Sequence, residues 1–425
     1  LRPPQACYAQ RAMAFRALAA AAAVLACLGC HSSGRRAGQD VAAERVDPLV
    51  LPPGEAPVRG ALRLAAVFPT IGRYAVSGLQ SLNGVRLAVD EINRAGGIQG
   101  RSVELREYRT GSYFVDARQA ARLAAAEGVL AIVGSNSSEL SRAVAEEAEV
   151  RGLVQVSNVS TAQDLTWDPE TARNRAFVFR VCSSDVVMGA LLAEYAVDDL
   201  GARRAAVLYE VGRDYSKKLA RSFVDRFQET SGEVPREFFY LALETDFRPQ
   251  LRLIADYGPD VIFVPGSFTD ATLIAAQASA LGLGATLLGG DGWSNPLLFR
   301  RGRPPGEAYF VELCSPSPDF ERRYQSVFGR ETQGCRAILG HDAVRVLAAG
   351  LRSLGPLPDE ALGEGLEETR LRLRNAVAAG EVEGASGVIR FDAHGDRRQG
   401  VALSAVESDP DGRPVALVRG WLGEP

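Results

Sequence analysis

The chain of 425 residues carries 48 Lys and Arg against 52 Asp and Glu, a formal net charge of −4, and 46% of its residues are hydrophobic. This near-neutral balance argues against a nucleic-acid-binding protein, which shows a basic face. The ordinary apolar content excludes wholesale disorder and a polytopic membrane protein. Because one domain typically has about 100–200 residues, we expect two domains.

The first sixty residues differ from the rest of the chain. A short basic region from Met13 to Arg16 precedes the apolar residues 17–29, which are typical of an export signal and fewer than the roughly 20 needed to span a bilayer. This stretch ends in Ala26-Cys27-Leu28-Gly29-Cys30, which resembles a bacterial lipobox, with Cys27 or Cys30 as the acylated residue. The alternative is an ordinary cleaved signal in which the two thiols have no role. We predict a signal and lipobox over 1–30 and a flexible tether over 31–60.

From residue 61 onward, apolar β-rich runs alternate with amphipathic helical windows. The first set pairs strands at 62–68, 103–108 and 129–133 with helices at 83–93, 117–126 and 139–150. The second set pairs strands at 205–209, 238–243, 261–264 and 285–288 with helices at 215–230, 247–257 and 271–281. Continuous Val, Ile and Leu runs that alternate with helices indicate parallel sheets built from βαβ units.

Two such sets, separated near residues 177–184, predict two doubly wound lobes. The tail differs, because short strands at 388–391, 401–406 and 415–421 surround a turn at His394-Gly395-Asp396, and we expect them to add to one sheet. Ligands of open α/β sheets bind beyond the carboxyl ends of the strands, so the default site is the cleft between the lobes.

Motifs spread along residues 61–410 resemble those of the type I periplasmic binding proteins, in particular the branch that binds leucine, isoleucine and valine. They are, in order, Phe68-Pro69-Thr70, Asn83-Gly84-Val85, Asp90-Glu91-Ile92-Asn93, Ala95-Gly96-Gly97-Ile98, Ile132-Val133-Gly134 with Ser137-Ser138, Phe179-Arg180-Val181-Cys182, Asp214-Tyr215, Gly258-Pro259-Asp260-Val261, Gly289-Gly290-Asp291-Gly292-Trp293, His341-Asp342-Ala343-Val344 and Phe391-Asp392 with Gly395-Asp396. Each motif alone is weak, but the whole series in the family's order is specific.

The resemblance implies an α/β fold of two doubly wound parallel-sheet lobes, joined by a three-segment hinge that closes on a ligand. The N-terminal lobe would comprise 61–181 and 315–385, and the C-terminal lobe 182–314 and 386–425. Residues 183–185 and 315–318 are plausible crossing segments. The implied function is capture of an amino acid or similar small molecule and its delivery to the permease of an ABC importer. We expect an exported monomer that is tied to the membrane only by its lipid anchor and binds no nucleic acid. A ligand-sensing receptor component is the alternative.

An α-amino acid needs donors for its carboxylate and an acceptor for its ammonium. By the resemblance, Ser138 and Thr161 bind the carboxylate, with Ser137 beside them and Val159 and Ser160 offering main-chain contacts. On the sequence alone these residues are equally well explained as helix caps.

Two residues of the second set of elements complete the implied site. Asp291, in a turn between glycines, would pair with the ammonium, and Tyr215 would close over the ligand. Taken by themselves, a turn Asp more often bonds its own backbone, and an isolated Tyr more often packs in a core.

The pocket for the ligand's side chain is the least determined part of the site. Phe268, together with Tyr74, Ser77 and Trp293, is a candidate, although an aromatic residue near a strand end is more often part of the core. Relatives usually carry an acidic pair after the second strand, where this chain has Glu107-Tyr108-Arg109. This departure concerns specificity more than the fold.

Nothing in the sequence indicates catalysis, a metal or a cofactor. His31, His341 and His394 do not fall at metal-ligand spacing, and His341 is expected to begin a helix. A hydrolase or other enzyme on the same two-lobe fold is the less favoured alternative. Among Cys182, Cys314 and Cys335 the possibilities are a Cys182–Cys314 disulfide, a Cys314–Cys335 disulfide or three free thiols.

Overall fold

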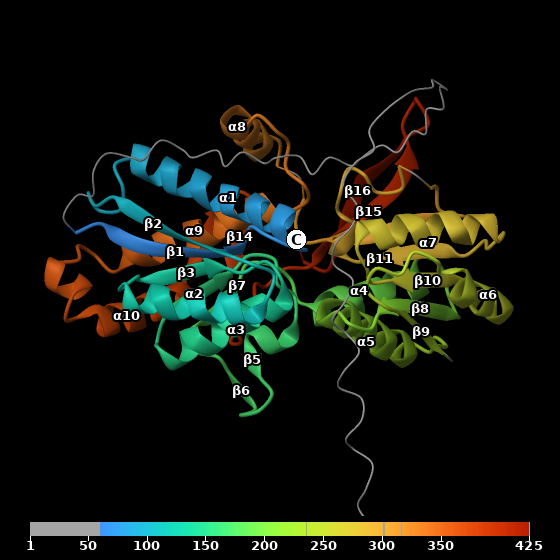
Figure 1. The fold of residues 1–425 in the computed structure, drawn as a ribbon, viewed down its shortest axis with the longest axis horizontal. Coiled ribbons are helices and arrows are strands. Elements are labelled where there is room, and N and C mark those ends of the chain that lie inside the picture. The colour runs from blue at the N-terminus through green and yellow to red at the C-terminus, as the bar shows by residue number, and fades with distance from the viewer. Residues whose placement is uncertain (1–59, 235, 301, 316, 425) are drawn as a thin grey trace, which may run out of the picture. The chain divides into compact units, whose positions relative to one another are not determined.

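The computed structural model describes residues 60–424 except 235, 301 and 316, so the predicted signal, the candidate lipidation sites Cys27 and Cys30 and nearly all of the tether lie outside the described residues. Two main sheets organise this part of the chain, each with helices on both faces (Figure 1). We call the five-stranded sheet with its helices the first lobe and the seven-stranded sheet with its helices the second lobe. The predicted α/β fold of two lobes is confirmed.

The first sheet is entirely parallel, with the strand order β2-β1-β3-β4-β7. Its strands are β1 (Leu62–Pro69), β2 (Val103–Thr110), β3 (Ala131–Gly134), β4 (Val154–Ser157) and β7 (Val178–Arg180). The central strand β1 shows how the two layers of helices are held. Leu64, Ala66 and Phe68 join the core against helices α1 and α9, whereas Ala65 and Val67 join the core against α2 and α3. Successive strand residues point to opposite faces, so an apolar run such as β1 requires helices on both sides.

The helices of the first lobe come from both ends of the chain. They are α1 (Ala75–Arg94), α2 (Phe114–Ala126), α3 (Ser138–Val150), α8 (Pro318–Phe328), α9 (Arg336–Ser353) and α10 (Leu366–Ala379), with short 3-10 turns η1 (Gln163–Leu165) and η3 (Asp359–Leu362). Helix α1 packs so closely on α9 that a Cβ at Gly84 would lie only 1.8 Å from the Ala337 carbonyl oxygen. The expectation that His341 begins a helix is wrong, since it lies inside α9, which starts at Arg336.

The second sheet has the order β16-β15-β12-β11-β10-β8-β9. It is parallel from β9 to β12, and β15 and β16 then extend it as an antiparallel hairpin, as expected for the tail. Its strands are β8 (Ala205–Glu210), β9 (Glu237–Tyr240), β10 (Val261–Val264), β11 (Thr286–Gly289), β12 (Ala308–Glu312), β15 (Val401–Ser408) and β16 (Pro414–Leu422). Its helices are α4 (Asp185–Asp198), α5 (Asp214–Glu229), α6 (Arg248–Tyr257) and α7 (Phe268–Ala280), with the 3-10 turn η2 (Asp291–Trp293).

Two small hairpins lie outside the main sheets. They are formed by β5 (Trp167–Asp168) with β6 (Arg173–Asn174) and by β13 (Glu381–Gly384) with β14 (Gly387–Arg390). The prediction that 388–391 adds to a large sheet is therefore wrong. The segment pairs only with β13, and Ile389 and Phe391 pack in the first lobe, where the Phe391 ring lies 5.2 Å from that of Phe179.

The chain passes between the two sheets three times. The connections are residues 181–184 between β7 and α4, residues 313–317 between β12 and α8, and residues 391–400 between β14 and β15. The first and third connections are tied to each other, because the guanidinium of Arg180 donates to both carboxylate oxygens of Asp396 at 2.7 Å and the hydroxyl of Ser183 donates to the Gly400 carbonyl at 2.7 Å. The exact bounds of the lobes stay a prediction.

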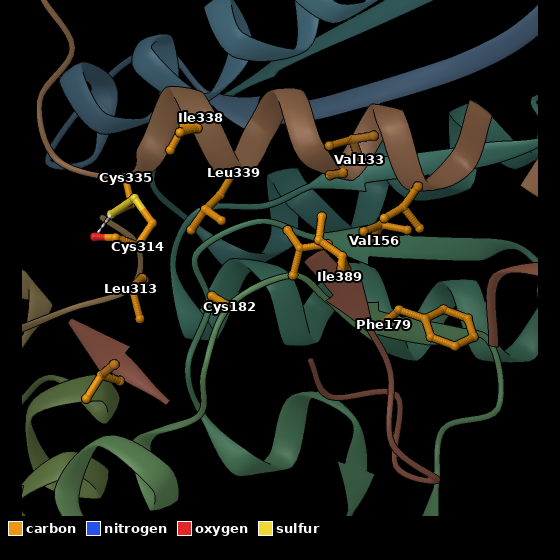
Figure 2. Close-up of a cluster of buried hydrophobic side chains, with 14 of the residues drawn as sticks. Val133, Val156, Phe179, Cys182, Leu313, Cys314, Cys335, Ile338, Leu339 and Ile389 are labelled. Atoms are coloured by element: carbon orange, nitrogen blue, oxygen red, sulfur yellow. Dashed lines mark hydrogen bonds between the residues drawn. A yellow bond between two sulfur atoms is a disulfide. The ribbon is translucent and has the colours of Figure 1, made fainter. Parts of the chain in front are cut away.

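One disulfide braces the second connection. Cys314 follows β12 and is bonded to Cys335, which directly precedes α9, with 5.8 Å between their Cα atoms (Figure 2). Of the alternatives that the sequence left open, the structure therefore has the Cys314–Cys335 pairing. Cys182 is a free, fully buried thiol, and burial raises its pKa. None of the helices in the described part of the chain is long and apolar enough to cross a membrane.

Candidate functional site

A cavity lies between the two lobes and is lined by residues of both. Eight of the predicted site residues line it: Tyr74, Ser77, Ser137, Ser138, Val159, Thr161, Tyr215 and Asp291. The other lining residues are Asn136, Glu139, Arg213, Gly292, Ser294, Leu313, Cys335 and Arg336. Most of them stand where a strand ends or a helix begins, which is where sites in open α/β sheets form.

The start of α3 presents free donors to the cavity. Ser137 precedes the helix, but its hydroxyl does not cap it, and among the described residues that buried hydroxyl has no hydrogen-bond partner. Ser138 is the first helical residue and is buried. The first amides of a helix lack partners within the helix and carry a partial positive charge. The geometry therefore suits a carboxylate, and for Ser137 it disfavours the role of a plain helix cap.

The turn that carries Thr161 is held in place by Arg180. The guanidinium of Arg180 donates to the carbonyl oxygens of Thr161 at 2.7 Å and Ala162 at 2.8 Å, while Asp396 neutralises its charge. The hydroxyl of Ser160 lies 2.5 Å from that of Ser141 and does not line the cavity. Ser160 thus fixes the turn from behind, whereas Thr161 faces the cavity.

The opposite wall carries Asp291 and Tyr215. The phenol of Tyr215 donates to Oδ1 of Asp291 at 2.8 Å and accepts a hydrogen bond from the Gly292 amide at 3.1 Å. Glycine is required beside this pair, because a Cβ at Gly290 would lie 2.5 Å from the Tyr215 oxygen. Burial raises the pKa of Asp291, and the Tyr215 hydrogen bond and the charges of Arg336 and Arg213 oppose that shift. A buried carboxylate of this kind favours a cationic partner.

Two arginines of the cavity wall were missed by the sequence analysis. Arg213 precedes α5 and lies with its guanidinium carbon 5.0 Å from the centre of the Tyr215 ring. Arg336 is the first residue of α9, and its Nη1 donates to the Gln333 carbonyl at 3.0 Å. Burial lowers the pKa of Arg336, the charge of Asp291 opposes this shift, and Arg213 adds to it. Two features of the sequence could have pointed to these arginines. Arg213 is next to the Asp214-Tyr215 motif, and Arg336 is next to a cysteine.

Trp293 and Phe268 do not line the cavity. The indole N–H of Trp293 donates to the Val264 carbonyl at 3.0 Å, and the ring is fully buried in the core of the second lobe. The turn η2 directs Trp293 inward, so that its ring covers Gly289, where a Cβ would be only 2.1 Å away. Phe268 begins α7 and packs, half-buried, against the same core. The structure thus places both side chains away from the predicted pocket.

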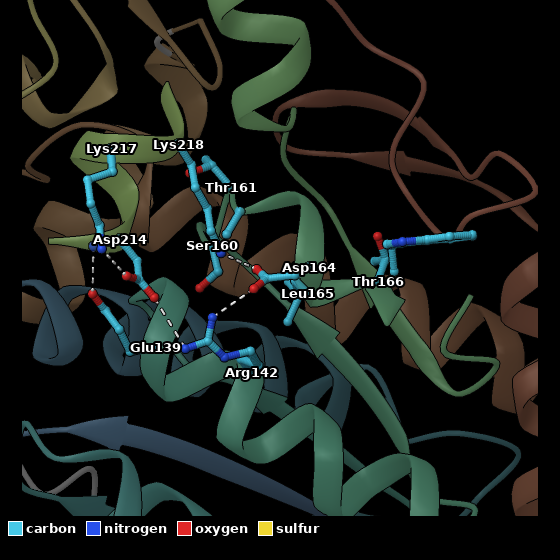
Figure 3. Close-up of polar contacts among 12 residues, drawn as sticks. Glu139, Arg142, Ser160, Thr161, Asp164, Leu165, Thr166, Asp214, Lys217 and Lys218 are labelled. Atoms are coloured by element: carbon cyan, nitrogen blue, oxygen red, sulfur yellow. Dashed lines mark hydrogen bonds and ion pairs between the residues drawn. The ribbon is translucent and has the colours of Figure 1, made fainter. Parts of the chain in front are cut away.

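Ion pairs connect the lobes beside the cavity. Arg142 of α3 contacts Asp164 at 2.7 Å and reaches across to Asp214 of α5 at 3.2 Å, while Lys218 of α5 contacts Asp164 at 2.5 Å (Figure 3). We call these four residues the inter-lobe ion cluster.

A second ion pair joins the loop after β1 to the end of β8. Arg73 donates to both carboxylate oxygens of Glu210, at 2.9 and 2.7 Å. The Arg73–Glu210 pair and the inter-lobe ion cluster thus connect the two lobes beside the cavity.

No group of three His, Cys, Asp or Glu side chains within the described ranges could hold a metal ion. His341 lies between Glu91 and Asp342, at 2.9 and 3.3 Å, and joins α1 to α9 away from the cavity. His394 is in a surface turn, where its Nδ1 lies 2.8 Å from the side-chain oxygen of Asn174. Both histidines therefore have structural partners outside the site.

Comparison with known proteins agrees with this architecture. The Leu/Ile/Val-binding protein BraC3 of Rhizobium johnstonii is 28% identical over 317 residues, which are 72% of this chain and 83% of that relative. The crystal structure of the leucine-binding protein LivK from Thermotoga maritima, 28% identical, has a TM-score of 0.72 over 85% of this chain and 99% of that one. The structure of LivJ from Streptococcus pneumoniae in complex with isoleucine, 23% identical, has a TM-score of 0.69 and covers 85% of this chain and 99% of its own, so it shares the fold. A sequence model of the family described as periplasmic binding protein matches residues 61–411, and the chain therefore belongs to the periplasmic binding proteins.

Proposed function

We propose that this protein is the substrate-binding component of an ABC importer and that it captures an amino acid between its two lobes. The carrying observation is the pairing of two opposite walls in one cavity. One wall offers the unpartnered hydroxyl of Ser137 and the start of α3, and the other offers Asp291, oriented by Tyr215. An α-amino acid has a carboxylate for the first wall and an ammonium for the second.

The roles follow the chemistry of each side chain. Ser138 and Thr161, with the amides at the start of α3, would bind the carboxylate, and Asp291 would accept from the ammonium while Tyr215 covers the ligand. Val159 would contribute main-chain contacts, and Tyr74 and Ser77 would shape the side-chain pocket. The names of relatives support this proposal, because BraC3 and LivK are called Leu/Ile/Val-binding and leucine-binding proteins.

A thermal-shift screen of the twenty amino acids tests the proposal. A ligand that binds only the folded state raises the melting temperature. At a ligand concentration of 100 times the dissociation constant, it adds about 2.7 kcal/mol to the free energy of unfolding. We expect at least one amino acid to give a concentration-dependent rise. No rise with any amino acid at millimolar concentration would contradict the proposal.

We further propose that the bound ligand is released unchanged. The cavity contains carboxylates and hydroxyls but, among its lining residues, no histidine or cysteine thiol to serve as a general base or nucleophile, since Cys335 is held in a disulfide. Incubation of the protein with its ligand, followed by mass spectrometry, should recover the ligand intact. Accumulation of a product would favour the enzyme alternative.

Export, lipid anchoring and partnership with a permease are also proposals. They rest on the basic and apolar residues 13–29, on Cys27 and Cys30, and on the family. We expect palmitate labelling of cells to mark the protein and a Cys27→Ser, Cys30→Ser double variant to lose the label. Loss of import in cells that lack the protein would favour import over a sensing role.

A further inference from the structure

The two arginines of the cavity wall come from different lobes. Arg213 belongs to the second lobe and Arg336 to the first, and the residues that the structure describes offer neither of them a carboxylate within 4.0 Å. Arg336 has one carbonyl contact, and Arg213 lies over the Tyr215 ring. Two guanidinium groups thus line one cavity, and neither forms an ion pair within the part of the chain that the structure describes.

Other arginines beside the cleft are paired. Arg73 binds Glu210 through both of its carboxylate oxygens, and Arg142 contacts Asp164 and Asp214. The chain therefore provides acidic partners for the cationic groups on the rim of the cleft. Within the described ranges it provides none for the two groups that line the cavity. A partly buried charge without an ion-pair partner costs free energy, because it loses part of its hydration and gains no ion pair.

The acidic groups of the cavity do not fill this gap. Asp291 is engaged by Tyr215 at 2.8 Å, and Glu139 accepts a hydrogen bond from the Asp214 amide at 3.4 Å. If Asp291 pairs with the ligand ammonium and the start of α3 pairs with the ligand carboxylate, a neutral amino acid leaves both arginines as they are. A second carboxylate on the ligand would give the two guanidinium groups an ionic partner inside the cavity.

The rest of the cavity lining is more polar than a pocket for an aliphatic side chain would need to be. Of the sixteen lining residues only Val159 and Leu313 have aliphatic side chains, and six are Ser, Thr or Asn with side chains that offer hydrogen bonds: Ser77, Asn136, Ser137, Ser138, Thr161 and Ser294. The side-chain oxygen of Asn136 is buried and has no hydrogen-bond partner among the described residues. A pocket for leucine or valine gains its affinity from apolar contact, which this lining offers at two aliphatic side chains and at the rings of Tyr74 and Tyr215.

We infer that the ligand is an amino acid with an acidic side chain, and that Arg213 and Arg336 bind its second carboxylate as the lobes close. This inference rests on the proposed function and names its substrate class. Arginine suits the role because its planar guanidinium binds a carboxylate through two parallel hydrogen bonds. The disulfide helps, because Cys335 is bonded to Cys314 and fixes the backbone directly before Arg336. Recognition then differs from that of the relatives whose names specify leucine, isoleucine or valine.

Calorimetric titration of the full protein with L-glutamate, L-aspartate, L-glutamine and L-leucine tests the inference. Glutamate and glutamine have the same shape and differ in the charge of the side chain, so their comparison needs no variant. We expect one of the two acidic amino acids to bind at least about 30-fold more tightly than glutamine and leucine, the factor typical of a desolvated charge pair.

Variants then assign the effect to the two arginines. Arg336→Met and Arg213→Met should each weaken binding of the acidic amino acid at least about 30-fold while changing glutamine affinity little. Arg336→Lys should restore part of the loss. Arg330→Met, which alters an exposed arginine just before the same segment, is the matched control and should bind as the parent does. Circular dichroism and the melting temperature establish that each variant is folded.

The outcomes separate the inference from the proposed function. Leucine or glutamine binding as tightly as the acidic amino acids, with no loss in either arginine variant, would overturn the inference and leave the proposed function intact. Absence of binding by all four ligands and by the remaining amino acids would instead defeat the proposed function.

Discussion

The hydroxyl of Tyr215 donates a hydrogen bond of 2.8 Å to Asp291, and this bond joins the start of α5 to the turn after β11 at the wall of the cavity. It keeps the Asp291 carboxylate directed at the cavity and counteracts the rise in its pKa caused by burial. Burial and the Asp291 charge in turn raise the pKa of Tyr215 far above its usual value, so the phenol remains a donor throughout the physiological range.

Replacing Tyr215 with Phe should weaken amino-acid binding about tenfold without unfolding the protein. The reason is that a hydrogen bond to a charged group contributes about 1.5–3 kcal/mol, and Asp291 would lose its only side-chain donor of those described. Calorimetry measures the change. Tyr209→Phe, at a partly buried position on β8 outside the cavity, is the control. Equal affinities for the Tyr215→Phe variant and the parent would show that the bond does not orient Asp291.

Breaking the Cys314–Cys335 disulfide should lower both stability and ligand affinity. The bond closes a loop with a sequence separation of 21 residues, which corresponds to about 3 kcal/mol of stabilisation. Cys335 and Arg336 both line the cavity, so a loosened segment also weakens the site. We expect the Cys314→Ser, Cys335→Ser variant to melt at a lower temperature than the oxidised parent.

The control for this prediction is reducing agent. It should lower the melting temperature of the parent and leave that of the double variant unchanged. A parent that melts at the same temperature with and without reductant would contradict the prediction.

Asp185 should make stability depend on pH. It begins α4 at the first connection between the lobes, and burial raises its pKa to about 7; the Asp291 charge adds to the rise, while Thr161, Arg180 and Lys218 oppose it. The unfolded state loses its proton near pH 3.8, whereas the folded state keeps it up to about pH 7. The carboxyl therefore reduces stability as pH rises through this window, and above it the reduction stays constant.

Asp185→Asn removes that dependence. The stability of the variant relative to the parent should increase with pH between about pH 4 and pH 7, by at most about 1.4 kcal/mol per pH unit, and then level off. Urea denaturation at pH 5, 6, 7 and 8 measures it. Asp198→Asn, at the exposed far end of α4, should show no such trend. A relative stability that is independent of pH for Asp185→Asn would be the contrary result.

The inter-lobe ion cluster should strengthen ligand binding modestly and in a salt-dependent way. Lys218→Met removes the contact with Asp164 that spans the lobes in Figure 3. Because partly exposed ion pairs contribute about 0.2–1 kcal/mol, we expect up to about fivefold weaker binding at low salt.

That difference should shrink as salt is raised, and titrations at two salt concentrations measure it. The control is Arg221→Met, whose partner Asp225 lies on the same helix and so does not connect the lobes. If both variants lose affinity equally, the cluster has no specific role in closure.

The sequence predicted the fold well because the strands are continuous apolar runs with strong periodicity, as in β1, β3 and β10. Asp291 and Ser138, which the sequence named because of their motifs, line the cavity, and their roles in binding stay a prediction. Trp293 was misplaced, since a sequence motif does not specify that the turn after Asp291 directs the ring into the core. Val388 belongs to a strand that pairs only with β13, a choice made by tertiary contacts.

The two cavity arginines show the limit most clearly. A single arginine at the start of a helix has no distinguishing pattern, and most such residues are solvated. Arg213 and Arg336 are 123 positions apart in the chain and meet only because the lobes face each other. Only the folded structure therefore shows that the two arginines line one cavity.

Titration of the parent and of Asp291→Ala with the amino acid that binds best is the decisive test of the proposed ammonium site. We expect that the parent binds one ligand per chain and that the variant, with an unchanged circular dichroism spectrum, loses at least about 2 kcal/mol of binding free energy, because the ammonium loses its partner. Unchanged affinity in a folded Asp291→Ala variant would contradict it.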